Sequence, residues 1–152
     1  MNYVIIGNST AAVGCIEQIR KTDQKGKITV ISDEPYHTYG RPLISYYLLG
    51  RVDAAHMGYR PADFYEKNGV KTLLGVRAEK IDPAAKKVLL QGGKSVSYDK
   101  LLVATGSRPF VPPMEGYDTV KEKFTFMTFA DALALEQALS PEKDVLIVGA
   151  GL

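Results

Sequence analysis

The stretch N-Y-V-I-I-G-N-S-T-A-A-V-G, from Asn2 to Gly14, decides the fold of this chain. It begins with a short apolar, β-rich run that Gly7 interrupts, and helix-forming residues follow from Ala11 to Arg20. This order predicts a buried strand, a tight turn and a helix. The free N–H groups of the first helical turn and the positive end of the helix dipole then point at one place, which favours a pyrophosphate.

The turn matches the dinucleotide-binding fingerprint G-x-G-x-x-G/A with one exception. Gly7 fits the first position, Ser9 stands where the second glycine is expected, and Ala12 is a permitted third residue. The second glycine normally allows the backbone to approach the phosphates closely. Ser9 therefore either loosens the phosphate fit or adds a hydroxyl donor to it.

A second buried strand is predicted from Lys27 to Ser32, and the strand, helix and strand together imply a right-handed crossover to a parallel neighbour. Asp33 ends this strand. The fingerprint expects a carboxylate about 20 residues after its glycines, where it accepts both ribose hydroxyls. The alternative interpretation is that Asp33 and Glu34 only open a polar loop.

Composition limits the class of protein. The chain has 152 residues, one cysteine, no tryptophan and a formal net charge of +2. The length predicts one domain with a real core, and the scattered basic residues do not indicate nucleic-acid binding. The lone Cys15 suits a buried helix position in a reducing cytoplasm and provides no dithiol pair. We expect no signal peptide, no membrane span and no metal site, and a cytoplasmic location.

An aromatic loop from Pro35 to Gly50 follows the acidic residues, and loops of this composition usually line a site. Pro42 favours an extended conformation for Arg41, so the guanidinium is predicted to project from a stiff point. Ser45 is expected to cap a short helix that runs to Leu49. His37 has no acid or nucleophile at a telling spacing and is interpreted as a loop residue.

The middle of the chain changes to short strands after a predicted helix from Pro61 to Asn68. We predict a small antiparallel meander inserted into the parallel pattern, with strands over residues 70–74, 77–81, 86–91 and 95–98. A buried parallel strand from Lys100 to Ala104 then delivers Thr105, Gly106 and Arg108 at its carboxyl end, where open α/β sheets bind ligands.

The last part of the chain predicts a strand from Phe124 to Thr128 and a helix from Phe129 to Leu139 capped by Thr128. A strand from Lys143 to Val148 then runs into Gly149, Ala150 and Gly151, which open a second fingerprint. No helix follows, so we expect these residues to be the front part of a longer protein. The alternative is a helix-free strand at the C-terminal edge.

Four motifs in this order resemble the FAD-dependent pyridine nucleotide-disulfide oxidoreductase family, over the whole chain. They are the first fingerprint with Asp33, Y-G-R-P-L-I-S from Tyr39 to Ser45, A-T-G-S-R-P from Ala104 to Pro109, and the V-G-A-G run. The resemblance is to the rubredoxin-reductase-like and nitrite-reductase-like members that have no redox disulfide. It implies an α/β fold, with a Rossmann-like parallel sheet, helices on both faces and the inserted meander. It also implies that residues 1–142 are the first segment of an FAD-binding domain and that residues 143–152 begin an NAD(P)H-binding domain.

The resemblance also implies which residues bind FAD, and the residue-level reasoning agrees on Gly7, Asp33 and Thr105. The catalytic residues stay unknown. The implied cofactor-binding residues are Gly7, Ser9, Thr10, Ala11, Asp33, Glu34, Arg41, Pro42, Ser45, Arg77, Ala78, Ala104, Thr105, Gly106 and Arg108.

The first functional hypothesis is a flavoprotein oxidoreductase that moves electrons from NAD(P)H through FAD to a small electron-transfer protein or an inorganic acceptor. These residues would be its FAD-binding portion, inactive alone. A second hypothesis is a nucleotide-binding module without activity, and a third is an NAD-dependent dehydrogenase. Exposed apolar surface and a sheet edge predict pairing with a second copy into a homodimer.

Overall fold

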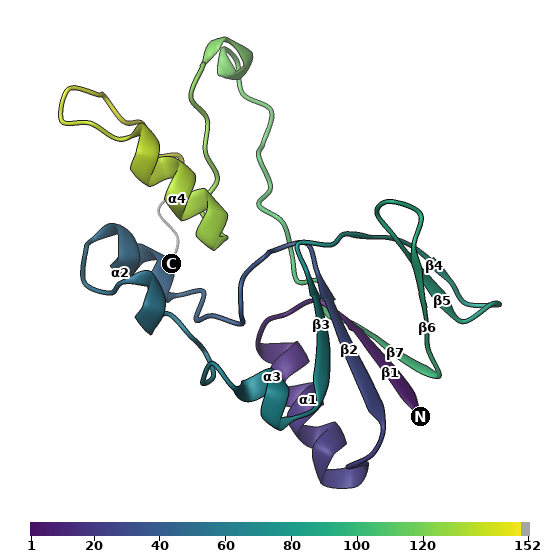
Figure 1. The fold of residues 1–152 in the computed structure, drawn as a ribbon. Coiled ribbons are helices and arrows are strands. Elements are labelled where there is room, and N and C mark those ends of the chain that lie inside the picture. The colour runs from purple at the N-terminus through teal and green to yellow at the C-terminus, as the bar shows by residue number, and fades with distance from the viewer. Residues whose placement is uncertain (150–152) are drawn as a thin grey trace. The chain divides into compact units, whose positions relative to one another are not determined.

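The computed structural model describes residues 1–149, which fall into two units (Figure 1). The first unit consists of Met1–Gly40 with Ala54–Ser107, and the second of Arg41–Asp53 with the described part of Arg108–Leu152. No helix among the described residues is both long enough and apolar enough to cross a bilayer.

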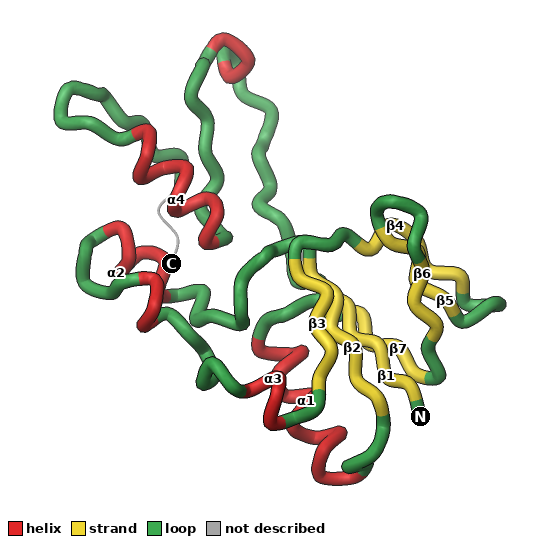
Figure 2. The backbone as a smooth tube through the Cα atoms, in the orientation of Figure 1, coloured by secondary structure: helices red, strands yellow, loops and turns green. Residues whose placement is uncertain are grey.

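A four-stranded parallel sheet forms the centre of the first unit, in the order β3-β2-β1-β7 (Figure 2). The two central strands, β1 and β2, are buried because both of their faces are covered, whereas the edge strands β3 and β7 contain no fully buried residue, so the prediction of a buried strand from Lys100 is wrong. The helix α1, Thr10–Thr22, makes the crossover from β1 to β2, as the opening stretch predicts. The strands are β1 (Asn2–Ile6), β2 (Lys27–Ser32), β3 (Val70–Leu74) and β7 (Lys100–Val103).

Two apolar clusters cover the two faces of this sheet, because successive side chains of a strand point to opposite sides. Ile5 packs with Val13 and Ile16 of α1 and with Phe64 of the one-turn helix α3, Phe64–Lys67. Val4 packs on the other face with residues of the antiparallel sheet. That sheet has the order β4-β5-β6 and contains Ala78–Asp82, Lys87–Leu90 and Ser95–Ser97.

The predicted α/β class is confirmed, but the prediction of helices on both faces of the sheet is wrong for this unit. Helices α1 and α3 lie on one face, and the meander takes the place of a helix layer on the other (Figure 1). The segment Val70–Leu74 was predicted within the meander, yet it pairs in parallel with β2. The connection after β2 contains α3 and is long enough for a parallel crossover, which a hairpin prediction overlooks. A 3-10 turn at Ala54–His56 precedes α3.

Arg20 fastens the end of α1 to the turn before β3. Its guanidinium donates to the carbonyl oxygens of Asn68 at 2.6 Å, of Asp23 at 2.9 Å and of Gly26 at 2.9 Å. A planar group with five donors can bond several carbonyls at once, which an ammonium cannot. The clamp holds helix, loop and strand together at the end of the sheet opposite Gly7.

The second unit contains α2, Leu43–Leu48, a 3-10 turn at Tyr117–Thr119, and α4, Phe129–Ala138. Tyr47 joins the two helices: its ring meets Phe129 edge-on with centroids 5.1 Å apart, and its hydroxyl donates to Glu136 at 2.9 Å. Thr128 caps α4 in a reciprocal capping box with Asp131, so the predicted cap is confirmed.

Three local predictions in the second unit are wrong. Phe124 to Thr128 is not a strand, because the Asp131 carboxylate accepts the N–H groups of Met127 and Thr128 and folds the segment around the start of α4. Residues 143–148 form no strand, because no described segment pairs with them and their side chains stay exposed. Ser45 does not cap α2, which begins earlier at Leu43, and its hydroxyl donates to the Pro42 carbonyl at 3.1 Å. The end of the second fingerprint, residues 150–152, lies outside the described residues.

Candidate functional site

The turn after β1 requires glycine at position 7. Gly7 has φ 116°, and a Cβ atom there would lie 2.0 Å from the carbonyl oxygen of Ala104, just beyond β7. Its N–H donates to the carbonyl of Ile31 at 2.8 Å. Only a residue without a side chain allows the backbones to approach so closely, so the turn lies in direct contact with the end of β7.

The first turn of α1 presents backbone N–H groups without partners inside the helix. Ser9 is the N-cap residue in an extended conformation, and its carbonyl accepts the first helical bond from Val13 at 3.1 Å. Its side chain makes no capping bond, and no acidic residue stands in the first turn. The N–H groups of Thr10 and Ala11 and the positive end of the helix dipole therefore point out of the N-terminal end of α1. This arrangement favours the binding of an anion there.

The carboxyl ends of three strands lie level with one another at this edge. Ile6 pairs with Ile31 on one side and with Val103 on the other. Asp33 follows β2 and is exposed, while Thr105 follows β7 and is exposed as well. Gly7, Asp33, Ala104 and Thr105 therefore share the sheet edge where parallel α/β sheets bind ligands.

The start of the meander lies beside the acidic residues. The N–H of Val76 donates to the carbonyl of Ser32 at 2.8 Å, and the N–H of Gly75 donates to the carbonyl of Glu34 at 3.2 Å. Arg77 and Ala78 come directly after this contact. The Glu34 carboxylate accepts the Tyr39 hydroxyl at 2.5 Å, so Glu34 also has a structural role.

Four predicted site residues belong to the second unit, and their part in the site stays a prediction. Arg41 donates to the carbonyl of Met127 at 3.1 Å, Pro42 precedes the first turn of α2, and Ser45 lies within that helix. Arg108 is exposed in an irregular segment. Gly106, with φ 70°, lies one residue before the end of the first unit.

Sequence reasoning missed a polar group at the fingerprint turn. Asn8 donates to the carbonyl of Tyr36 at 3.1 Å and accepts a hydrogen bond from the Tyr65 hydroxyl. An amide side chain inside a glycine turn carries both a donor and an acceptor, which is a usable sequence signal. Tyr65 gave no signal, because only the folded chain brings α3 to this turn.

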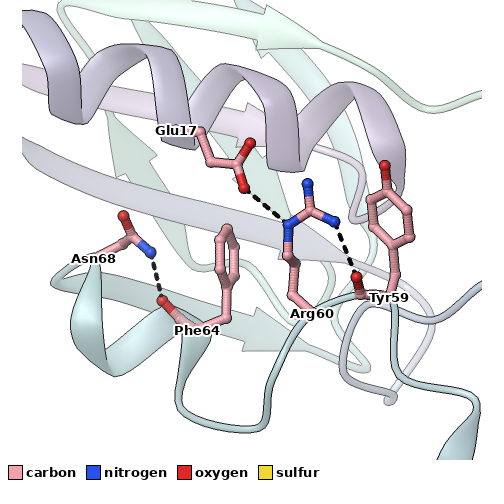
Figure 3. Close-up of polar contacts among 5 residues, drawn as sticks. All are labelled: Glu17, Tyr59, Arg60, Phe64 and Asn68. Atoms are coloured by element: carbon pink, nitrogen blue, oxygen red, sulfur yellow. Dashed lines mark hydrogen bonds and ion pairs between the residues drawn. The ribbon is translucent and has the colours of Figure 1, made fainter.

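The loop before α3 is itself tied to α1. Figure 3 shows Arg60 between Glu17 and Tyr59. The Arg60 guanidinium donates to the Glu17 carboxylate at 2.8 Å and to the carbonyl of Tyr59 at 3.0 Å. The hydrogen bond from Arg60 lowers the pKa of Glu17. The figure also shows Asn68 donating to the carbonyl of Phe64, at 2.7 Å, which closes the turn of α3.

Other parts of the described chain add no further chemistry to this edge. No three His, Cys, Asp or Glu residues among residues 1–149 gather as a metal ion would require. The half-buried Cys15 lies in α1, and burial raises the pKa of its thiol. A hollow of about 460 Å³ lies between β3 and the β5–β6 hairpin, lined in part by Lys71 and Lys94, and it includes none of the predicted site residues.

A family model described as pyridine nucleotide-disulphide oxidoreductase matches residues 1–152. The chain belongs to this family. The chain is 37% identical over 154 residues to the nitrite reductase (NADH) large subunit of Escherichia coli (strain K12), in a match that covers 100% of this chain and 18% of that protein. It is 34% identical over 150 residues to subunit epsilon of the NADH-dependent phenylglyoxylate dehydrogenase of Aromatoleum evansii, covering 99% of this chain and 35% of that protein.

A solved structure of the family supports the fold. The crystal structure of NADH:rubredoxin oxidoreductase from Clostridium acetobutylicum matches with a TM-score of 0.76 and 26% identity, over 90% of this chain and 35% of that one. The chain therefore spans about a third or less of the length of the relatives it matches. The predicted membership of the pyridine nucleotide-disulphide oxidoreductase family is confirmed.

Members of the pyridine nucleotide-disulphide oxidoreductase family bind FAD and use NAD(P)H, and the predicted cofactors are confirmed at that level. The residues of this chain fit the adenosine diphosphate end of FAD. Gly7 lets the turn close against the Ala104 carbonyl, the N–H groups of the first turn of α1 have no partner inside the helix, and the exposed carboxylate of Asp33 follows the neighbouring strand.

Proposed function

We propose that this chain is the FAD-binding portion of an oxidoreductase that passes electrons from NAD(P)H through FAD to a small protein or inorganic acceptor. The observation that carries the proposal is the meeting of Gly7, the first turn of α1 and Asp33 at one sheet edge. Each of them supplies what one part of an adenosine diphosphate group requires.

In this proposal each part of the chain has its own task. The N–H groups at the start of α1, from Ser9 to Ala11, bind the pyrophosphate, and Asp33 accepts the ribose hydroxyls. Bound FAD supplies hydride acceptance from a nicotinamide and onward electron transfer. The remaining residues contact the rest of the cofactor, and they are Glu34, Arg41, Pro42, Ser45, Arg77, Ala78, Ala104, Thr105, Gly106 and Arg108.

Calorimetric titration with FAD, ADP and NAD tests the binding proposal. We expect FAD and ADP to bind, and we expect Asp33→Asn to weaken both about tenfold, because a charged hydrogen bond is lost. The matched control Asp144→Asn alters an exposed carboxylate and should change neither affinity. A clear preference for NAD would support a dehydrogenase instead. If none of the three ligands binds, the proposal fails.

The acceptor and the domain division are further parts of the proposal. A small protein acceptor is supported by the name of the rubredoxin oxidoreductase that this chain resembles. We propose that residues 1–142 belong to the FAD-binding domain and that residues 143–152 begin the NAD(P)H-binding domain. The 152 residues alone are expected not to oxidise NADH in the presence of FAD and ferricyanide, and turnover in that assay would contradict this.

A homodimer and a cytoplasmic location complete the proposal. Support for self-association comes from the exposed apolar run Val145 to Val148 and from β7, which ends the sheet order. In analytical ultracentrifugation, the fraction of dimer should rise with protein concentration. A strict monomer at all concentrations would contradict the proposal. A single unpaired cysteine, Cys15, agrees with a reducing compartment.

A further inference from the structure

Asn8 lies in the middle of the fingerprint turn and uses both ends of its amide. Its Nδ2 donates to the carbonyl of Tyr36 at 3.1 Å, and its Oδ1 accepts from the Tyr65 hydroxyl. The same hydroxyl accepts the N–H of Thr38 at 3.3 Å. One amide and one phenol therefore join the turn after β1 to the loop after β2.

The surrounding side chains hold Tyr65 in place. Its side chain is 8% exposed and belongs to the apolar cluster between α1 and the sheet. The His37 ring stacks against it, tilted, with centroids 4.6 Å apart, and the Phe64 ring packs on it at 5.4 Å. Burial raises the pKa of Tyr65, so its hydroxyl keeps the proton that it donates to Asn8.

The connection spans the two halves of the site. Asn8 adjoins the N–H groups of the first turn of α1, while Tyr36 and Thr38 lie shortly after Asp33 in the same loop. A ligand with a pyrophosphate and a ribose must meet both halves at one fixed separation. A side chain that bonds both halves sets that separation before the ligand arrives, which reduces the entropy lost on binding.

We infer that Asn8 and Tyr65 are positioning residues that hold the phosphate-binding turn and the ribose-binding loop at the separation an adenosine diphosphate group requires. The inference rests on the proposed function for the identity of the ligand. The coupling of the two segments is a property of the chain alone and can be measured without any ligand.

Amide hydrogen exchange of the ligand-free chain tests the coupling. In Asn8→Ala and in Tyr65→Phe, the amides of residues 7–11 and 36–38 should exchange about tenfold faster, because buried partners lose their bonds. Two matched controls remove similar bonds elsewhere in the same unit: Asn68→Ala deletes the bond to Phe64, and Tyr3→Phe deletes the bond to Asp23. Neither control should change exchange in these two segments. Unchanged exchange in Asn8→Ala and Tyr65→Phe would overturn the inference.

Comparing ADP with adenosine distinguishes a positioning role of Asn8 and Tyr65 from a general loss of structure in the variants. Asn8→Ala should weaken ADP, which meets both halves, about tenfold, yet weaken adenosine, which meets only the ribose loop, less than about twofold. The loss of ADP affinity in the double variant with Tyr65→Phe should be smaller than the sum of the two single losses, because the two changes remove one shared bond. Equal losses for ADP and adenosine, or fully additive losses, would overturn the inference. If the unaltered chain binds no nucleotide, the proposed function fails while the exchange experiment still decides the coupling.

Discussion

Gly7 and Gly14 lie seven residues apart on the same strand-to-helix unit, and we predict opposite effects for the same substitution at the two positions. An added Cβ at Gly7 would lie 2.0 Å from the Ala104 carbonyl oxygen and 2.6 Å from its carbon. The turn must therefore open by at least about 1 Å, or the end of β7 must move away. At Gly14, on the exposed face of α1, an added Cβ meets nothing within 4 Å.

The two magnitudes follow from the backbone and the overlap. A non-glycine residue at φ 116° is strained by about 1–3 kcal/mol, and forcing an atom into the packed turn adds about 1–3 kcal/mol. We expect Gly7→Ala to lower the free energy of unfolding by about 4 kcal/mol. Gly14→Ala replaces glycine inside a helix and should raise it by about 1 kcal/mol.

Urea unfolding followed by circular dichroism measures both changes. With a slope of about 2 kcal/mol per molar urea, the midpoint of Gly7→Ala should fall by about 2 M and that of Gly14→Ala should rise by about 0.5 M. A free energy of unfolding for Gly7→Ala within about 1 kcal/mol of that of the unaltered chain would contradict the close contact with Ala104. A loss of stability in Gly14→Ala would show that the helix face is not free as described.

Three other predictions concern single side chains. Arg20→Ala should lower the free energy of unfolding by about 2 kcal/mol, since four carbonyls lose a charged donor. Arg20→Lys should recover less than half of that loss in the same urea experiment, and full recovery would contradict a role for the planar guanidinium. Burial works to raise the pKa of Asp131, but the N–H groups of Thr128 and Met127 outweigh it and hold the pKa below its ordinary value. The ionised Asp131 carboxylate therefore stabilises the fold above about pH 4, and this stabilisation is lost as the pH falls through the lowered pKa. The difference in free energy of unfolding between the unaltered chain and Asp131→Asn should shrink on acidification. A difference that does not change with pH would contradict this prediction. Burial raises the pKa of the Cys15 thiol, so little of it is ionised and reactive at pH 7.5. Its alkylation by iodoacetamide at that pH, followed by mass spectrometry, should proceed at about a tenth of the rate of glutathione or less. An equal rate would mean that the thiol is more accessible than its burial indicates.

Local patterns were sufficient for the central strands and the first helix. Val4, Ile5 and Ile6 form one unbroken apolar run, and Gly7 is followed directly by helix formers, so the strand, turn and helix could be placed from composition and spacing alone. The Thr128 cap of α4 was equally readable, because an N-cap side chain bonds the backbone only three residues further along the chain. Both partners of such a short-range interaction lie within a few residues of one another, so the sequence alone is enough to predict it.

Tertiary contacts decided what remained. Val70–Leu74 has the same composition as a hairpin strand, and only its partner β2 makes it parallel. Lys143 to Val148 has a strand pattern, yet a strand exists only where another strand accepts its hydrogen bonds. Local sequence patterns were enough to predict the glycine turn, the carboxylate after β2 and the family. The structure decided which backbone fills the space at Gly7 and which tyrosine bonds Asn8, because Ala104 and Tyr65 reach that turn only when distant segments pack together.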